Sequence, residues 1–123
     1  MCLMRTEGWR EDAINWIHRH ASDLPDPPPT AWHVARPSLI ARQYALHIIR
    51  YMPANFVPVE LGITLDRGIE LDWRNGQKEL EIEVRSDGSI EILRCVAGKT
   101  IEESTMSEPN WRLGEAVVWL ERP

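Results

Sequence analysis

The sequence predicts an α+β domain in which a four- to five-stranded antiparallel meander carries helices packed on one face. Apolar residues recur at helical spacing before residue 53 and again after residue 109, whereas from residue 57 to residue 95 they alternate with polar ones. A chain of 123 residues, 43% of them hydrophobic, is long enough to bury one core. Three turn sequences interrupt the alternating part, at residues 66–68, 75–76 and 86–88.

The first helix is predicted over residues 5–21. Four prolines between residues 25 and 29 should end it and favour an extended linker over residues 22–35, because proline cannot continue a helix. A second helix should begin at Pro37, which suits a first helical turn, and end before Pro53. The expected division within one globular unit is an N-terminal helix and Pro-rich linker at 1–35 and the α+β domain at 36–123.

The turn chemistry gives an expected register for the strands. Asn75-Gly76 favours a two-residue hairpin loop, and the other two turns favour three-residue loops with glycine in the left-handed conformation. All three choices place apolar side chains on one face, as a half-buried sheet requires. The expected pairs are Leu71 with Leu80, Ile69 with Ile82, Leu65 with Ile69, and Val84 with Ile90.

The end of the chain supplies a further helix. A fifth strand near residues 99–106 fits the pattern, but its register stays open. Ser107 or Glu108 should cap a last helix that has Pro109 in its first turn. This helix and the one before Pro53 are expected to cover the apolar face of the sheet.

Charge is divided unevenly along the chain. Residues 1–59 have a net charge of +1, whereas residues 60–123 have a net charge of −6. This balance argues against binding nucleic acid through its phosphates, so no nucleic-acid partner is expected. No segment is apolar enough for a signal peptide or a membrane span, and two cysteines make neither a disulfide framework nor a zinc site. We therefore expect a cytoplasmic protein without a membrane partner.

The expected registers place like charges opposite one another on the outer face of the sheet, which is unfavourable. A solvated face softened by Arg74, Lys78 and Arg85 is one explanation. A docking surface for a basic protein partner is another, and paired-carboxylate catalysis or divalent-metal binding is a third. The expected like-charge pairs are Glu70 with Glu81, Asp72 with Glu79, and Glu83 with Glu91.

Other chemistries find little support in the sequence. His18 and His20 are two residues apart on a predicted helix, so they do not share a face for a metal. No serine or cysteine lies in a nucleophile motif, and no phosphate-binding glycine loop is present. We therefore predict no catalytic residue, metal ligand or cofactor. Three of the six tryptophans either seal the core or anchor an interface: Trp9, Trp16 and Trp32.

The stretch from Leu65 to Trp73, followed by Glu-Leu-Glu-Ile-Glu-Val at 79–84 and Ser-Asp-Gly-Ser-Ile at 86–90, resembles a loose group of small uncharacterised bacterial accessory proteins. Their shared pattern is D-G-G-I-x-L-E-W, then L-E-I-E-I, then a D-G-S turn, after a helix led by Pro-Ser. Pro37-Ser38 matches that start, whereas Arg67 replaces the first glycine. The resemblance implies a cytoplasmic accessory protein of a two-gene, defence or mobile-element operon, and it brings no catalytic residues.

These observations together predict a non-enzymatic protein-binding module that is antitoxin-like, immunity-like or an effector adaptor. Its partner is expected to be a basic protein encoded nearby, and its oligomeric state stays open. The alternative is a small carboxylate-dependent enzyme or a metal-dependent ligand binder. The expected partner-binding residues are Glu70, Asp72, Glu79, Glu81, Glu83, Glu91, Trp9, Trp16 and Trp32.

Overall fold

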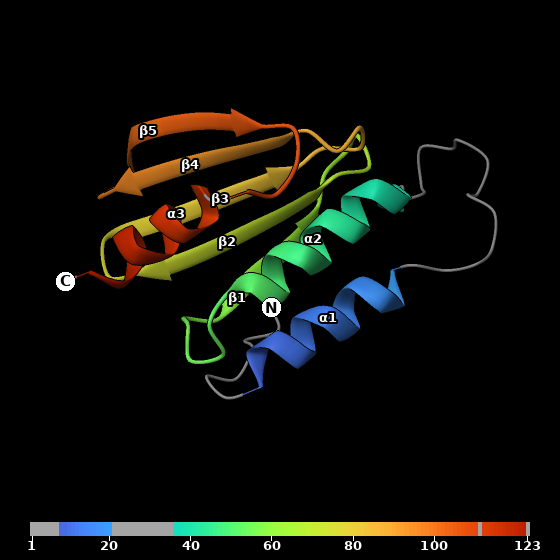
Figure 1. Ribbon diagram of the computed structural model, residues 1–123, viewed down its shortest axis with the longest axis horizontal. Coiled ribbons are helices and arrows are strands. Elements are labelled where there is room, and N and C mark those ends of the chain that lie inside the picture. The colour runs from blue at the N-terminus through green and yellow to red at the C-terminus, as the bar shows by residue number, and fades with distance from the viewer. Residues whose placement is uncertain (1–7, 21–35, 111, 123) are drawn as a thin grey trace.

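The computed structural model describes residues 8–20, 36–110 and 112–122, which form three helices and five strands (Figure 1). The strands make one antiparallel sheet in the order β1-β2-β3-β4-β5, so the predicted α+β meander is confirmed with a fifth strand. Among the described residues, no helix has the length and apolar character needed to cross a bilayer. The elements are α1 (Trp9–Arg19), α2 (Leu39–Tyr51), β1 (Val59–Ile63), β2 (Ile69–Asn75), β3 (Lys78–Val84), β4 (Ile90–Val96), β5 (Lys99–Met106) and α3 (Arg112–Glu121).

One buried cluster joins the helices to the sheet. Alternate residues of β2 and β3, such as Leu71 and Ile82, are fully buried together with residues of all three helices. In Figure 1, α3 lies across β2 and β3, and α1 runs beside α2. Because Trp9 and Ile17 of α1 belong to this cluster, the first helix packs as part of the same core.

Each helix begins later than the sequence suggests. Helix α2 is capped by Ser38, whose Oγ accepts a hydrogen bond from the Ala41 amide at 3.2 Å. The expected caps of the last helix, Ser107 and Glu108, are wrong, because Asn110 Oδ1 accepts the Arg112 amide at 3.0 Å instead. The predicted Pro-rich linker at 22–35 lies outside the described residues.

The hairpin between β1 and β2 is shifted by two residues from the predicted register. Ile63, rather than Leu65, pairs with Ile69. Leu65 therefore lies in the connecting loop, where its side chain is fully exposed, and the expectation that it belongs to the apolar face is wrong. Thr64 Oγ1 accepts a hydrogen bond from the Gly68 amide at 2.8 Å, and this bond closes the loop. The sequence Asp66-Arg67-Gly68, from which the turn was predicted, does not indicate this contact.

The hairpin between β2 and β3 is shifted in the same way. Asn75 pairs with Lys78, so the two-residue loop is Gly76-Gln77 and not Asn75-Gly76. Gly76 has a φ of 63° and occupies the first loop position, which suits glycine. Since a shift of two residues preserves the alternation, the apolar face is the predicted one although the predicted pairs are wrong.

The remaining two hairpins complete the sheet. Val84 pairs with Ile90, as predicted, and Gly88 adopts a φ of 90° in the loop between them. Strand β5 pairs with β4 across an irregularity at Arg94 and Cys95. The extra residue on one strand is typical of a β-bulge, and it explains why alternation alone left the register of this strand open.

Candidate functional site

The side of the sheet opposite the core carries eight carboxylates, which we call the acidic face. Each alternates along its strand with residues whose side chains point to the core side, and strand pairing brings them into adjacent rows. Sequence reasoning found six of the eight. It missed Glu60, although Glu60 alternates with buried Val59, and it missed Glu103 because the register of the fifth strand was open. The acidic face comprises Glu60, Glu70, Asp72, Glu79, Glu81, Glu83, Glu91 and Glu103.

The corrected register changes which carboxylates oppose one another. The expected pairs Glu70 with Glu81 and Asp72 with Glu79 are wrong, because both follow from the misplaced β2–β3 loop. The pair of Glu83 with Glu91 is confirmed. Like charges therefore still lie opposite one another in adjacent strands, and the unfavourable contacts persist. The observed like-charge pairs are Glu60 with Asp72, Asp72 with Glu81, Glu70 with Glu83, and Glu83 with Glu91.

Two arginines offset part of this charge. Arg74 lies 3.0 Å from Glu79 and 3.5 Å from Asp72, and Arg85 forms an ion pair with Glu91. Lys78 does not soften the face as expected, because its Nζ donates instead to Trp119 O of α3 and to Arg122 O just after that helix, on the core side. Within the described part of the chain, the carboxylates of the acidic face without an ion pair are Glu60, Glu70, Glu81, Glu83 and Glu103.

Asp72 is the most perturbed carboxyl of the acidic face. Its side chain is only 14% exposed, and its Oδ1 is buried without a hydrogen-bond partner among the described residues. Burial raises the pKa of Asp72 from 3.8 to about 7, and a hydrogen bond with Glu79 and repulsion from Glu79 and Glu81 act in the same direction. Asp72 is therefore close to half protonated near neutral pH.

A small hollow lies on the acidic face, over β2, β3 and β4. It has a volume of about 60 Å³ and is lined by Leu93 and four glutamates. Burial raises the pKa of Glu81 above its ordinary range, as do a hydrogen bond with Glu70 and repulsion from Glu79. Burial also raises the pKa of Glu83, against the attraction of Arg85. The hollow is thus rich in carboxyl oxygens, and two of its carboxyls, Glu81 and Glu83, bind a proton more readily than an ordinary glutamate does. Its glutamates are Glu70, Glu81, Glu83 and Glu91.

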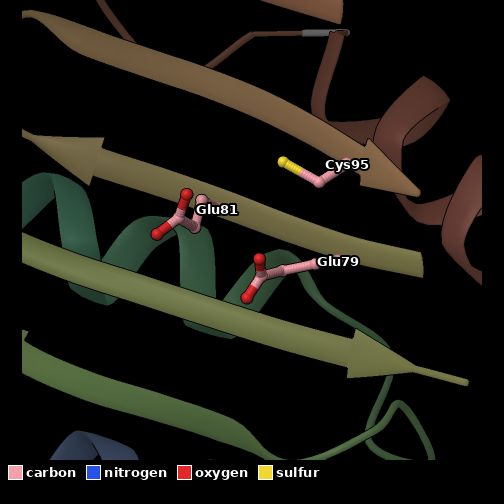
Figure 2. A group of neighbouring side chains, drawn as sticks. All are labelled: Glu79, Glu81 and Cys95. Carbon is pink, nitrogen blue, oxygen red and sulfur yellow. The ribbon is translucent and has the colours of Figure 1, made fainter. Parts of the chain in front are cut away.

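A cysteine joins the carboxylates at one end of the acidic face. Figure 2 shows Glu79 and Glu81 on one strand with Cys95 on the next, their side chains on the same side of the sheet. One ligand atom of each lies within 4.8 Å of the others, and Cys95 is only 7% exposed. Cys95 Sγ also lies 3.8 Å from Thr100 Oγ1. Sequence reasoning placed Cys95 in a strand but could not bring it beside Glu79 without the register.

Two of the three tryptophans expected to contact a partner lie among the described residues, in different surroundings. Trp9 is fully buried, donates its Nε1–H to Ala54 O at 3.1 Å and packs edge-on against Trp73 at 6.5 Å. The expectation that Trp9 contacts a partner is therefore wrong, because it has no surface to offer. Trp16 is partly buried and stacks on His20 with 4.2 Å between ring centroids. Trp32 lies outside the described residues.

The arrangement can attract cations, hold protons or ligate a metal ion. No family model matches the sequence, and neither the curated proteins nor the solved structures give a match. The charge and geometry of the acidic face are therefore the features from which a function can be inferred.

Proposed function

We propose that this chain is a non-enzymatic protein-binding module that holds a cationic segment of a basic partner on the acidic face. The supporting observation is the set of five carboxylates without ion pairs beside the desolvated Asp72. Like charges held on adjacent strands destabilise the free protein, and a basic segment would relieve that repulsion. The same charge would steer the partner from a distance at low ionic strength.

The hollow on the acidic face suits the end of one basic side chain. Its volume of about 60 Å³ is several times the roughly 10–15 Å³ that one water needs on the same measure, so it has room for the end of a side chain. A guanidinium or ammonium group placed there would donate to the surrounding glutamates, including Glu70 and Glu83. Charge-assisted hydrogen bonds of this kind are stronger than neutral ones. We therefore expect one lysine or arginine of the partner to occupy the hollow and neighbouring basic residues to contact the rows beside it.

Proton release should accompany this binding. Asp72, with a pKa of about 7, is partly protonated in the free protein near neutral pH. A cation nearby favours the ionised carboxylate and lowers its pKa. The partner should therefore bind more tightly as pH rises through about 7, and binding should release part of a proton.

The biological setting is also part of the proposal. A small binding module with an acidic face fits an antitoxin, an immunity protein or an effector adaptor that acts in the cytoplasm on a basic protein encoded nearby. The resemblance over residues 36–95 to bacterial accessory proteins of such operons supports this setting. The acidic face would bind the cationic segment, and the exposed part of the Trp16 side chain, on the helical side of the sheet, would contact a separate part of the partner.

The test compares two double variants with the same change in net charge. Glu70→Lys with Glu81→Lys alters the acidic face, whereas Glu108→Lys with Glu121→Lys alters exposed carboxylates away from it. Binding of a labelled arginine-rich peptide, and then of the product of a neighbouring gene, is followed by surface plasmon resonance at two salt concentrations. The acidic-face variant should lose about tenfold or more in association rate at low salt.

The matched variant separates a site from general attraction. If net charge alone attracts the probe, both double variants lose association rate equally, and the proposal is wrong. If the acidic face is the site, the variant at positions 108 and 121 keeps most of its association rate. Circular dichroism of both variants checks that the fold is retained.

A metal-dependent ligand binder is the second candidate, favoured by the group of Glu79, Glu81 and Cys95. A thiolate and two carboxylates suit a divalent ion such as zinc. Cobalt titration of a Cys2→Ser background should then give a sulfur-to-metal absorption band that Cys95→Ser removes. A band that saturates at stoichiometric cobalt, with no peptide binding, would favour this candidate over the docking proposal.

A further inference from the structure

The loop between β2 and β3 supplies a cap for the last helix. Asn75 Nδ2 donates to Leu120 O at 2.7 Å, and Lys78 Nζ donates to Trp119 O and Arg122 O, both at 2.9 Å. The last carbonyls of an α-helix have no partner within the helix. Two residues of a distant hairpin therefore satisfy the C-terminal end of α3.

Asn75 is also the one asparagine of the sequence that is followed by glycine. It precedes Gly76, and a Cβ built on Gly76 would meet nothing within 4 Å. Glycine lets another group approach the backbone closely, because it has no side chain. Each of the remaining asparagines precedes a bulky aromatic residue. These are Asn15 before Trp16, Asn55 before Phe56 and Asn110 before Trp111.

We propose that Asn75 is a site of spontaneous deamidation and that docking of α3 controls its rate. The Gly76 nitrogen loses its proton to solvent base and attacks Asn75 Cγ, forming a new N–Cγ bond. The bond from Cγ to Nδ2 breaks, and the nitrogen leaves as ammonia after taking a proton from water. Water then opens the cyclic imide at either carbonyl, which yields aspartate or isoaspartate. No oxidant, reductant or cofactor is needed.

The helix cap opposes this reaction. Asn75 Nδ2 is held toward Leu120 O on the core side, and Asn75 is paired with Lys78 in the strand ladder. The side-chain amide must leave Leu120 to meet the Gly76 nitrogen, so the reaction needs a transient opening of this contact. Deamidation in turn replaces the Nδ2 donor with a carboxylate that faces the same carbonyl oxygen. Opening of the cap and modification therefore favour each other.

The turn at Asp87-Gly88 also has a residue that can form a cyclic imide with a following glycine, but it is protected from this reaction in two ways. Gly88 N donates to Arg85 O at 2.9 Å, so the amide that would attack is engaged. The Asp87 carboxylate accepts hydrogen bonds from the Ser89 amide and hydroxyl, which hold the pKa of Asp87 below its ordinary value. An ionised carboxylate is a poor target for attack. Asp87 therefore serves as an internal comparison within the same sheet.

The experiment incubates the full-length protein at mildly alkaline pH and follows each asparagine by peptide mapping with detection of isoaspartate. Conversion at position 75 should precede any conversion at positions 15, 55, 87 and 110. Lys78→Met removes part of the cap and should speed conversion by roughly tenfold, about the effect of one charge-assisted hydrogen bond on an opening equilibrium. Lys99→Met, at an exposed position of β5, should leave the rate unchanged.

A second variant that loosens α3, and hydrogen exchange at the end of this helix, test the link between Asn75 and α3 independently. Val117→Ala weakens the packing of α3 without touching the loop and should also speed conversion, so it replaces Lys78→Met if that variant does not fold. Asn75→Asp should speed hydrogen exchange at the C-terminal end of α3. Conversion at Asn75 no faster than at the other asparagines would overturn the proposal. Equal rates in the loosened and control variants would overturn control by α3.

Discussion

Protonation of Asp72 should make the protein more stable in mild acid than at alkaline pH. A carboxyl whose pKa is higher in the folded state stabilises the fold only while it binds the proton. For Asp72 this stabilisation is fully present below pH 3.8, because 3.8 is the pKa expected in the unfolded chain. It is lost as the pH rises through the folded-state pKa of about 7. In this window the free energy of unfolding should fall by about 1.4 kcal/mol per pH unit for one proton.

The size of the effect follows from the two pKa values and the burial of the side chain. The gap between 3.8 and about 7 sets an upper limit of roughly 4 kcal/mol, and the remaining 14% exposure of the side chain to solvent lowers it, so we expect about 2–4 kcal/mol. Asp72→Asn keeps the shape of the side chain and removes the titration. The variant should therefore exceed the wild type in stability by about that amount above neutral pH.

Urea unfolding, followed by tryptophan fluorescence, measures the free energy of unfolding of the wild type and of Asp72→Asn. The measurements cover the pH range between the two pKa values of Asp72, 3.8 and about 7. Glu121→Gln, at an exposed carboxyl of α3, is the control and should follow the wild-type curve. Glu81 and Glu83 have raised pKa values as well, so the wild-type slope contains their contributions, whereas the difference from Asp72→Asn isolates Asp72. Parallel curves for the wild type and Asp72→Asn would refute the reasoning.

Five further substitutions, which make three tests, probe the sheet and the helix cap by thermal or urea unfolding. Ile82→Ala should cost about 2–4 kcal/mol, because a fully buried side chain leaves a cavity, whereas Glu81→Gln should be neutral or stabilising. Gly88→Ala should cost about 1 kcal/mol more than Gly98→Ala: both glycines have positive φ, but only a Cβ at the first would press on side chains of α2, at 2.8 Å from Ile40 and 3.2 Å from Tyr44. Ser38→Ala should cost about 1–2 kcal/mol through loss of the N-cap of α2.

Each of these expectations has a clear contrary result. A greater loss from Glu81→Gln than from Ile82→Ala would mean that the two faces of the sheet are inverted. Equal losses at the two glycines would show that backbone strain, and not contact with α2, decides the cost at position 88. An unchanged midpoint for the serine variant would show that the end of α2 is satisfied in another way.

The faces of the first four strands could be read from the sequence, but three of the four registers could not: those of β1–β2 and β2–β3 were predicted wrongly, and that of β4–β5 stayed open. Alternation assigns Leu71 and Ile82 to the core whichever loop is chosen, provided that the error is an even number of residues. The choice of loop depends on small differences in free energy between alternative turns. Asn-Gly favours one two-residue loop, yet the structure places Gly76 first in the loop and leaves Asn75 paired. The difference is linked to α3, whose Leu120 carbonyl accepts the Asn75 side chain. A local turn preference contains no information on this distant contact.

The acidic face was also predictable from the alternation of side chains along the strands. The position of Cys95, the burial of Trp9 and the raised pKa of Asp72 were not. Every glutamate that alternates with a buried residue on β2 and β3 falls on that face. The approach of Cys95 to Glu79 depends on the exact pairing of β3 with β4. The burial of Trp9 depends on where α1 lies, and a helical pattern does not specify that position. The raised pKa of Asp72 follows from desolvation, which composition does not report.

The meander order of the sheet has a consequence for the route of folding. Every strand pairs with its neighbour in the sequence, so each hairpin closes only a short loop. Low contact order of this kind is associated with rapid folding. The helices are different, since α1 and α2 precede the sheet and α3 follows it, and their contacts with it join distant parts of the chain. We expect the hairpins to form early and the helices to dock late. Until α3 is synthesised, part of the apolar side of β2 and β3 would face solvent, so a nascent chain should be most prone to aggregation just before its last helix emerges.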